Sequence, residues 1–241
     1  MTVLLQRTRP LLRRKEARLG RSVSTSLPAP VGGWNARDAK SDMAPEDAIT
    51  LENWFPGTTS VVTRNGYSKW STGYPDQVQT IFAYNAGLTS KLFGISNGAI
   101  YDGTAGGAVG AAAVSGLSNS KFQYINITTA AGGFLMAVNG ADMLQYFDGT
   151  TWSVDGGTYT ITGVNTSMIS GINLFKNRVW LIPTNTLKAW YLPTSSIQGA
   201  AAALDLSSIA TRGGYLVAMA TWTVDAGYGV DDLAVFITSQ G

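Results

Sequence analysis

The sequence predicts an all-β fold of β-propeller-like blades of antiparallel strands, with an extended basic N-terminal arm. Glycine is abundant at 28 residues and charged residues make up only 13% of the 241-residue chain, which favours sheets with tight turns over helices. Short apolar segments alternate with glycine- and asparagine-containing turns from residue 77 onward. Aligning Leu92, Leu135, Val179 and Ala234 gives intervals of 43, 44 and 55 residues. Such a period is typical of propeller blades.

Residues 1–33 are expected to form a basic arm and a linker. The first 30 residues hold seven Lys or Arg and one Glu, a net charge of +6, whereas the other 211 hold ten positive and fourteen negative residues, −4. Residues 22–33 are rich in Ser, Pro and Gly, as linkers are. Residues 1–21 would then be extended, or form a short helix only against a partner. The candidate partner-binding residues of the arm are Arg7, Arg9, Arg13, Arg14, Lys15, Arg18 and Arg21.

Three interpretations of the arm remain open. It threads between neighbouring subunits or docks on an acidic adaptor, and this interpretation is favoured. Alternatively, its cations contact DNA phosphates without regard to sequence. The third possibility is a solvated tail or a targeting segment, since Arg-rich segments with few acids also occur in mitochondrial presequences.

Residues 34–76 are expected to form a connecting segment. Pro45 followed by two acidic residues predicts a helix near Pro45–Leu51, because proline suits the first turn and acids favour the positive end of the helix dipole. Residues 60–64 are apolar and β-branched enough for a strand. Asn65-Gly66 then predicts a hairpin turn, with residues 67–70 as the returning strand.

Residues 77–241 are expected to form a partial β-propeller of about three to four blades, the last of them incomplete. An ordinary β-sandwich with repeated hairpins is the alternative. A further short helix is expected near Ile197–Leu204. The last copy lacks a partner strand for 232–238, so either the chain is a fragment, which we favour, or a neighbour completes the blade. The predicted strands are 78–84, 91–95, 99–103, 122–128, 133–138, 144–152, 168–175, 177–182, 188–192, 214–219 and 232–237.

The composition excludes several kinds of chemistry. The chain has no Cys and no His, which excludes disulfides, Cys/His zinc sites and catalytic triads that need an imidazole base. The longest apolar run, 108–114, is far too short for a membrane helix. Asp225, Asp231 and Asp232 would suit a paired-acid glycosidase or an oxygen-ligated metal, but turn chemistry is the favoured interpretation. We therefore expect no enzyme activity, no cofactor and no membrane partner.

Aromatic residues and two aspartate-glycine pairs complete the candidate features. Asp102-Gly103 and Asp148-Gly149 resemble loops of kelch-like blades but are better explained as hairpin turns. The tryptophans would also suit carbohydrate stacking, which keeps a glycan-binding surface β-propeller, adhesin- or lectin-like, as an alternative function. Most such residues are core or interface anchors. The expected anchors are Trp54, Phe55, Trp190, Tyr191 and Trp222.

Several phrases of the sequence resemble the tail nozzle proteins of short-tailed bacteriophages, also called tail hub or DNA-stabilisation proteins. The likeness covers residues 34–241, and its motifs concern packing, not catalysis. Members of that family are usually longer, which supports the fragment interpretation. The phrases are Asp42–Ala48, Leu51–Pro56, Arg64–Tyr67, Ala189–Pro193, Arg212–Tyr215, Thr221–Gly227 and Asp231–Ser239.

The resemblance implies a structural subunit of the virion tail, assembled in the host cytoplasm. It implies a β-propeller-containing chain in a hexameric ring below the portal and the head-to-tail adaptor. Its partners would be other copies of itself, the adaptor, tail fibres or a tail needle, and double-stranded DNA bound non-specifically in the channel. The slightly acidic body would repel DNA phosphates, so that the duplex slides through the channel during ejection. Before ejection, the ring would help to retain the packaged genome.

Overall fold

The computed structural model describes residues 26–225 and 230–240 and divides the chain into two compact units, Met1–Ser68 and Lys69–Gly241. The fold is all-β and consists of small, mostly antiparallel sheets, as predicted. Within the described residues the helical structure is limited to one 3-10 turn, η1 (Thr166–Met168). Unit 2 begins ahead of residue 77 because β5 (Ser71–Thr72) pairs with β9 (Gly107–Ala108) beside the first sheet.

Residues 26–68, the described part of unit 1, contain two short strand pairs instead of a helix. β1 (Gly33–Trp34) runs parallel to β2 (Asp47–Ala48), and β3 (Trp54–Pro56) runs antiparallel to β4 (Val61–Thr63). The helix predicted near Pro45–Leu51 is wrong, because its centre forms β2. The backbone groups there bond to the preceding segment: Gly32 N–H donates to Glu46 O at 2.8 Å.

The hairpin of unit 1 lies before Asn65-Gly66 and not around it. Its turn is closed by the Gly57 N–H, which donates to Ser60 O at 2.7 Å. The predicted turn at Asn65-Gly66 is wrong, since residues 64–69 contain no strand and Gly66 does not adopt the positive φ that a tight hairpin turn needs. The strand predicted at 60–64 is confirmed by β4, but its partner precedes it in the sequence.

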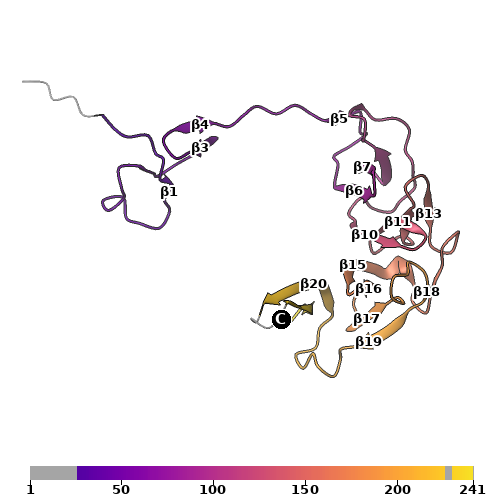
Figure 1. Ribbon diagram of the computed structural model, residues 1–241. Helices are drawn as coiled ribbons and strands as arrows, with labels where there is room; N and C mark the ends of the chain where they lie inside the picture. Colours follow the sequence, from indigo (N-terminus) through magenta and orange to yellow (C-terminus); the bar gives the residue numbers. More distant parts are fainter. Residues whose placement is uncertain (1–25, 226–229, 241) are drawn as a thin grey trace, which may run out of the picture. The chain divides into compact units, whose positions relative to one another are not determined.

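Four antiparallel sheets follow one another along the described part of unit 2 (Figure 1). The predicted strands from residue 77 onward are confirmed, except that 144–152 contains a turn between two strands. The helix predicted near Ile197–Leu204 is wrong, because that segment supplies strands to two sheets. Short parallel pairs join β5 to β9 and β14 (Ile161–Thr162) to β18 (Gly199–Ala200). In order, the sheets are β6 (Thr80–Ala86), β7 (Thr89–Ser96) and β8 (Ala99–Asp102); β10 (Gln123–Thr129), β11 (Gly132–Val138), β12 (Gln145–Phe147) and β13 (Trp152–Val154); β15 (Ile169–Phe175), β16 (Arg178–Pro183), β17 (Lys188–Tyr191) and β19 (Ala202–Asp205); and β20 (Leu216–Asp225) and β21 (Val230–Thr238).

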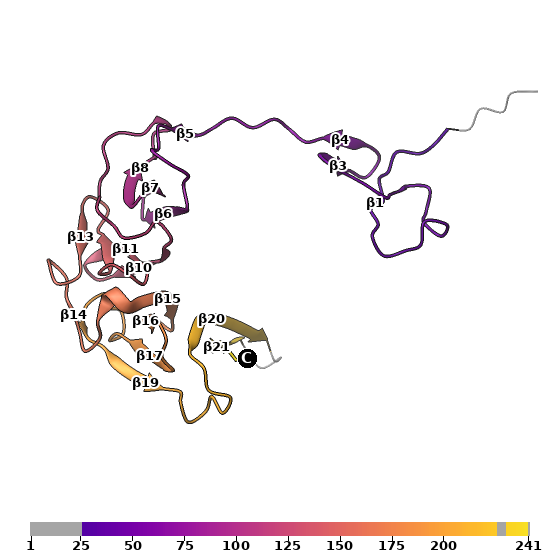
Figure 2. The same cartoon turned by 180° about the vertical axis from the view of Figure 1, so that it is seen from behind.

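Consecutive sheets of unit 2 pack face to face, so the second and third sheets bury both of their faces (Figure 2). Alternate residues of β11 show this directly: Leu135 and Ala137 pack toward the first sheet, whereas Phe134 and Met136 pack toward the third. Because side chains on both faces of these strands are buried, the strands are apolar along nearly their whole length. The core between the first and second sheets contains Phe82, Phe93 and Phe147. The core between the second and third sheets contains Met136, Tyr146 and Leu181, and the core between the third and fourth contains Ile182, Met219 and Phe236.

Side chains also tie the first strands of neighbouring sheets together. The Ala83 N–H of β6 donates to the Tyr124 hydroxyl of β10 at 3.3 Å, and the Asn126 amide donates to Ala83 O at 2.8 Å. In the same way, the Asn173 amide of β15 donates to Met219 O of β20 at 2.7 Å. These bonds satisfy backbone groups on strand edges that would otherwise be unpaired. The sheets therefore adjoin through their first strands.

Candidate functional site

The seven cations of the arm lie outside the described residues, so the structure neither places them nor groups them. The described candidates are the aromatic anchors and the acidic residues near the C-terminus. Their surroundings show which of them support the fold and which lie on exposed surfaces.

The part of unit 1 that the structure describes has almost no core of its own. Ala48 is its one buried hydrophobic residue between residues 26 and 68. Trp54 and Phe55 are 48% and 56% exposed, and as consecutive residues of β3 they lie on opposite faces of the hairpin. Trp54 borders a hollow of about 380 Å³, lined mainly by apolar side chains that include Pro30 and Val61. A small unit with exposed apolar side chains on both faces has the character of a binding surface.

Trp190 and Tyr191 are packing residues of unit 2. They lie on opposite faces of β17, and Trp190 packs against the core between the second and third sheets. The ring of Tyr191 lies 4.9 Å from that of Trp180, and the Arg178 guanidinium lies 5.4 Å from its centre. The structure thus places these two anchors within unit 2, where both are half-buried.

The hairpin β20–β21 has one packed face and one open face. Met219, Ala234 and Phe236 pack onto the third sheet. The register pairs Trp222 with Leu233 on the opposite face, and these side chains are 63% and 51% exposed. We call that side the open face, and its apolar residues are Ala218, Ala220, Trp222 and Val224 of β20 and Leu233, Val235 and Ile237 of β21.

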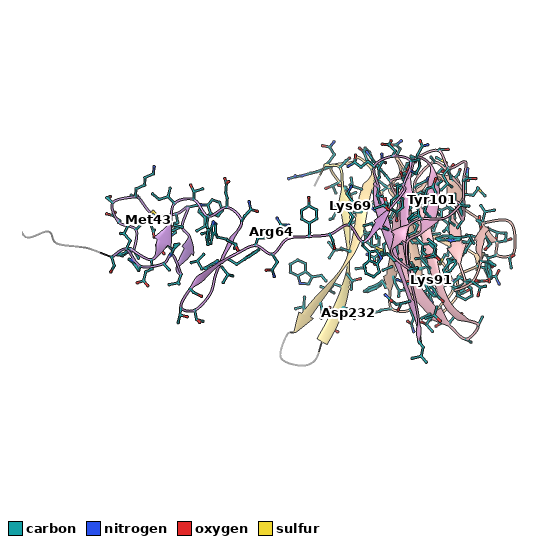
Figure 3. The ribbon with its side chains drawn as sticks, turned by 90° about the horizontal axis from the view of Figure 1, so that it is seen from above. Met43, Arg64, Lys69, Lys91, Tyr101 and Asp232 are labelled. Carbon is teal, nitrogen blue, oxygen red and sulfur yellow. The ribbon has the colours of Figure 1, made fainter. Side chains whose placement is uncertain are left out.

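The distal half of this hairpin is exposed on both faces. Thr223 and Asp232 form a cross-strand pair on the side away from Trp222, and both are exposed. The Thr223 hydroxyl donates to the Asp232 carboxylate at 2.7 Å. Figure 3 shows Asp232 on the part of the hairpin that stands clear of the other sheets of unit 2. This half is therefore a free ribbon and not part of a packed layer.

Asp231 and Asp232 do not form a paired-carboxylate site with each other. Asp231 and Asp232 lie within β21, so their prediction as turn residues is wrong, and as neighbours in a strand they point to opposite faces. In the part of the chain that the structure describes, no three acidic side chains gather as they would around a metal ion. The Asp225 side chain lies outside that description.

Asp148-Gly149 lies in a hairpin turn between β12 and β13, as predicted, but the hairpin turn predicted at Asp102-Gly103 is wrong, because this pair links β8 to β9 and β9 pairs with β5. Asp148 accepts the Thr150 and Thr151 N–H groups at 2.8 and 2.7 Å, and Asp102 accepts the Thr104 N–H at 2.9 Å. Burial raises the pKa of the Asp148 carboxyl, but the hydrogen bonds from Thr151 and Thr150 outweigh it and bring that pKa below its usual value. These groups close turns and are not arranged for catalysis.

One surface pocket of unit 2 combines aromatic rings with hydroxyls. It lies where the second sheet meets the loop 195–198 and has a volume of about 240 Å³. Phe134 and Tyr159 supply its apolar wall, their rings 5.4 Å apart. Thr129, Ser195 and Ser196 supply hydroxyls. No pattern in the sequence reveals this pocket, because its residues come from segments that are far apart in the chain.

The open face was identified only through Trp222. Its other large residues, Leu233, Val235 and Ile237, were recognised as part of a strand but not as a surface. The sequence does set this hairpin apart by its charge, since residues 213–241 contain three Asp and no Lys or Arg.

No protein-family model, curated protein or solved structure matches the chain. No helix within the described ranges is long and apolar enough to cross a membrane.

Proposed function

We propose that the chain is a structural subunit of a phage tail, the nozzle or hub ring that forms the DNA exit channel below the portal and adaptor. The observation that carries this proposal is the distribution of apolar surface. Large apolar side chains are exposed on unit 1 and on the open face of β20–β21, whereas Asp231 and Asp232 point to opposite faces of that hairpin. Exposed apolar surfaces without convergent reactive groups suit assembly better than catalysis.

The serial packing of the sheets supports a β-propeller as the form of unit 2. Sheets that bury both faces and adjoin through their first strands have the arrangement expected of blades around an axis. In an ordinary two-sheet sandwich each sheet would bury only one face. The resemblance to tail nozzle proteins noted for residues 34–241 would imply the same architecture in a ring of identical copies.

Immunogold electron microscopy of phage particles that carry this chain tests the proposal. Antibodies against unit 2 should label the tail at the single portal vertex. Labelling of the capsid faces, or no labelling of particles together with abundant chain on the host surface, would contradict it. Particles made without the chain should also lose packaged DNA, because the ring is proposed to help retain the genome.

A glycan-binding protein is the second candidate, and the pocket beside Tyr159 is the observation that favours it. Aromatic rings with nearby hydroxyls suit the apolar and polar faces of a sugar. Binding to a glycan array, lost in Tyr159→Ala and kept in Tyr215→Ala, would support this function. Absence of binding to the array would remove the candidate.

A further inference from the structure

The hairpin β20–β21 concentrates the negative charge of unit 2. Residues 69–212 hold seven positive and six negative residues, whereas residues 213–241 hold three Asp and no cation. Asp231 and Asp232 are exposed, and the hydrogen bond that Asp232 receives comes from the neutral Thr223 hydroxyl. None of the described cations forms an ion pair with either carboxylate. The charge is therefore available to a cationic partner.

The exposure of the hairpin indicates the shape of that partner. A further sheet would cover only the open face, whereas Thr223 and Asp232 are exposed on the other side of the same ribbon. The distal half also has two strand edges, to which an extended chain can add backbone hydrogen bonds. An extended segment with alternating contacts can engage Trp222, the carboxylates and a strand edge together.

The arm has the matching chemistry. Residues 1–21 contain seven cations and one acid, which complement the unpaired carboxylates. They also contain Leu4-Leu5 and Leu11-Leu12, which complement the exposed Trp222–Leu233 pair. The arm and the hairpin thus carry charges of opposite sign, and each also contains apolar side chains.

We propose that the distal half of β20–β21 binds the basic arm, residues 1–21, of a second copy of this chain. The inference rests on the proposed function, because contact with a neighbouring copy is what joins subunits in a ring. The arm cations pair with Asp231 and Asp232, and the arm leucines cover Trp222 and Leu233. Repeated around the ring, each hairpin receives the arm of one neighbour, which is a heterologous interface.

Photo-cross-linking of the full chain tests this docking. p-Benzoylphenylalanine is placed at position 222, and equal amounts of isotopically light and heavy chains are mixed before irradiation. The cross-linked peptides should join position 222 to residues 1–21 and include light–heavy pairs. The matched control is the same probe at Trp70, which is also 63% exposed in unit 2 and should not capture the arm.

Other cross-linking outcomes overturn the inference. Capture of sheets of a second copy in place of the arm would show sheet-on-sheet packing. Capture of the arm only within one chain would show that it serves its own copy. Native mass spectrometry of the same samples separates the two proposals: rings without arm capture leave the proposed function standing, whereas a monomer removes both.

Charge reversal supplies a second test that does not depend on the probe residue alone. Asp231→Lys with Asp232→Lys should reduce arm capture by at least about tenfold, because like charges would then face the arm. Adding Arg13→Glu and Arg14→Glu to the arm should restore most of the capture, which a misfolded hairpin would not allow. Unchanged capture in the first variant, or no restoration in the second, would overturn the charge pairing.

Discussion

At the residue scale, Asp155 is the one buried carboxylate among the described residues. It accepts the Ile161 N–H and the Thr166 hydroxyl, both at 2.8 Å, and the Tyr146 hydroxyl at 3.3 Å. Burial, with the adjacent carboxylate, raises the pKa of Tyr146, which keeps its hydroxyl a donor. The Asp155 carboxylate therefore joins the end of β13 to β14 and to the turn before β15.

Asp155→Ala should lower the free energy of unfolding by about 3 kcal/mol, since it leaves buried donors without an acceptor. Urea unfolding of the full chain, followed by tryptophan fluorescence, measures the change. The matched control is Asp42→Ala, at an exposed carboxylate, which should change stability by less than about 0.5 kcal/mol. Equal effects of the two variants would refute the structural role given to Asp155.

Asp142 provides a pH-dependent contact between the loop before β10 and the β11–β12 turn. Burial raises the pKa of its carboxyl, but hydrogen bonds from Ser118 and Asn139 outweigh burial, so the pKa lies below its usual value. A lowered folded-state pKa contributes stability above the unfolded-state pKa, and that contribution is lost as the pH falls through the folded-state value. The contact should therefore stabilise the protein at neutral pH and fail in acid.

Asp142→Asn should be less stable than the native chain by about 1 kcal/mol at pH 7, where the native carboxylate is charged. The difference should shrink as the pH falls below about 4, where an ordinary aspartate becomes protonated. Urea midpoints of both chains across this range measure it. A difference that stays constant with pH would mean that the charge of Asp142 contributes nothing.

At the element scale, the strands were predictable and their partners often were not. Leu92, Leu135, Val179 and Ala234, aligned from the sequence alone, all lie on second strands of their sheets. The order of the strands along the chain follows from short apolar segments separated by turn residues, which is a purely local signal. The helix predicted near Pro45–Leu51 failed because backbone pairing with β1 outweighed the local preference of proline and acids for a helix start.

The open face shows a second limit of sequence reasoning. Residues 233–237 are apolar on both faces of the strand, so the sequence does not show which face packs. The register places Trp222 opposite Leu233, and the core contacts of Met219, Ala234 and Phe236 identify the other face as the packed one. The pocket beside Tyr159 was likewise invisible, because it depends on how two distant segments meet.

The Asn97-Gly98 turn allows a matched test of local geometry. Both residues have positive φ, 48° and 66°, as a type I′ hairpin turn requires, and a β-carbon on Gly98 would contact the Leu117 carbonyl oxygen. Gly98→Ala should therefore destabilise the chain by about 2 kcal/mol or more. Gly87→Ala, with φ 57° and open space around it, should cost only about 1 kcal/mol. Equal urea midpoints for the two variants would contradict the steric part of this argument.

At the scale of the whole molecule, the proposal separates a body that folds from an arm that assembles. A chain lacking residues 1–21 should keep the β-sheet circular dichroism spectrum, because the described sheets are built without the arm. It should lose incorporation into particles, since the arm is proposed to join neighbours. Normal incorporation of the shortened chain would show that the arm is dispensable, and loss of the β-sheet spectrum would show that it supports folding instead.

Identical copies of this chain are proposed to associate into a closed ring. The decisive experiment is native mass spectrometry of the purified full chain, over a range of concentrations and at low and high salt. We expect one dominant closed oligomer, six copies in the proposed nozzle, that weakens as salt screens the pairing of basic and acidic segments. A chain that remains monomeric at every concentration and salt would rule out the ring.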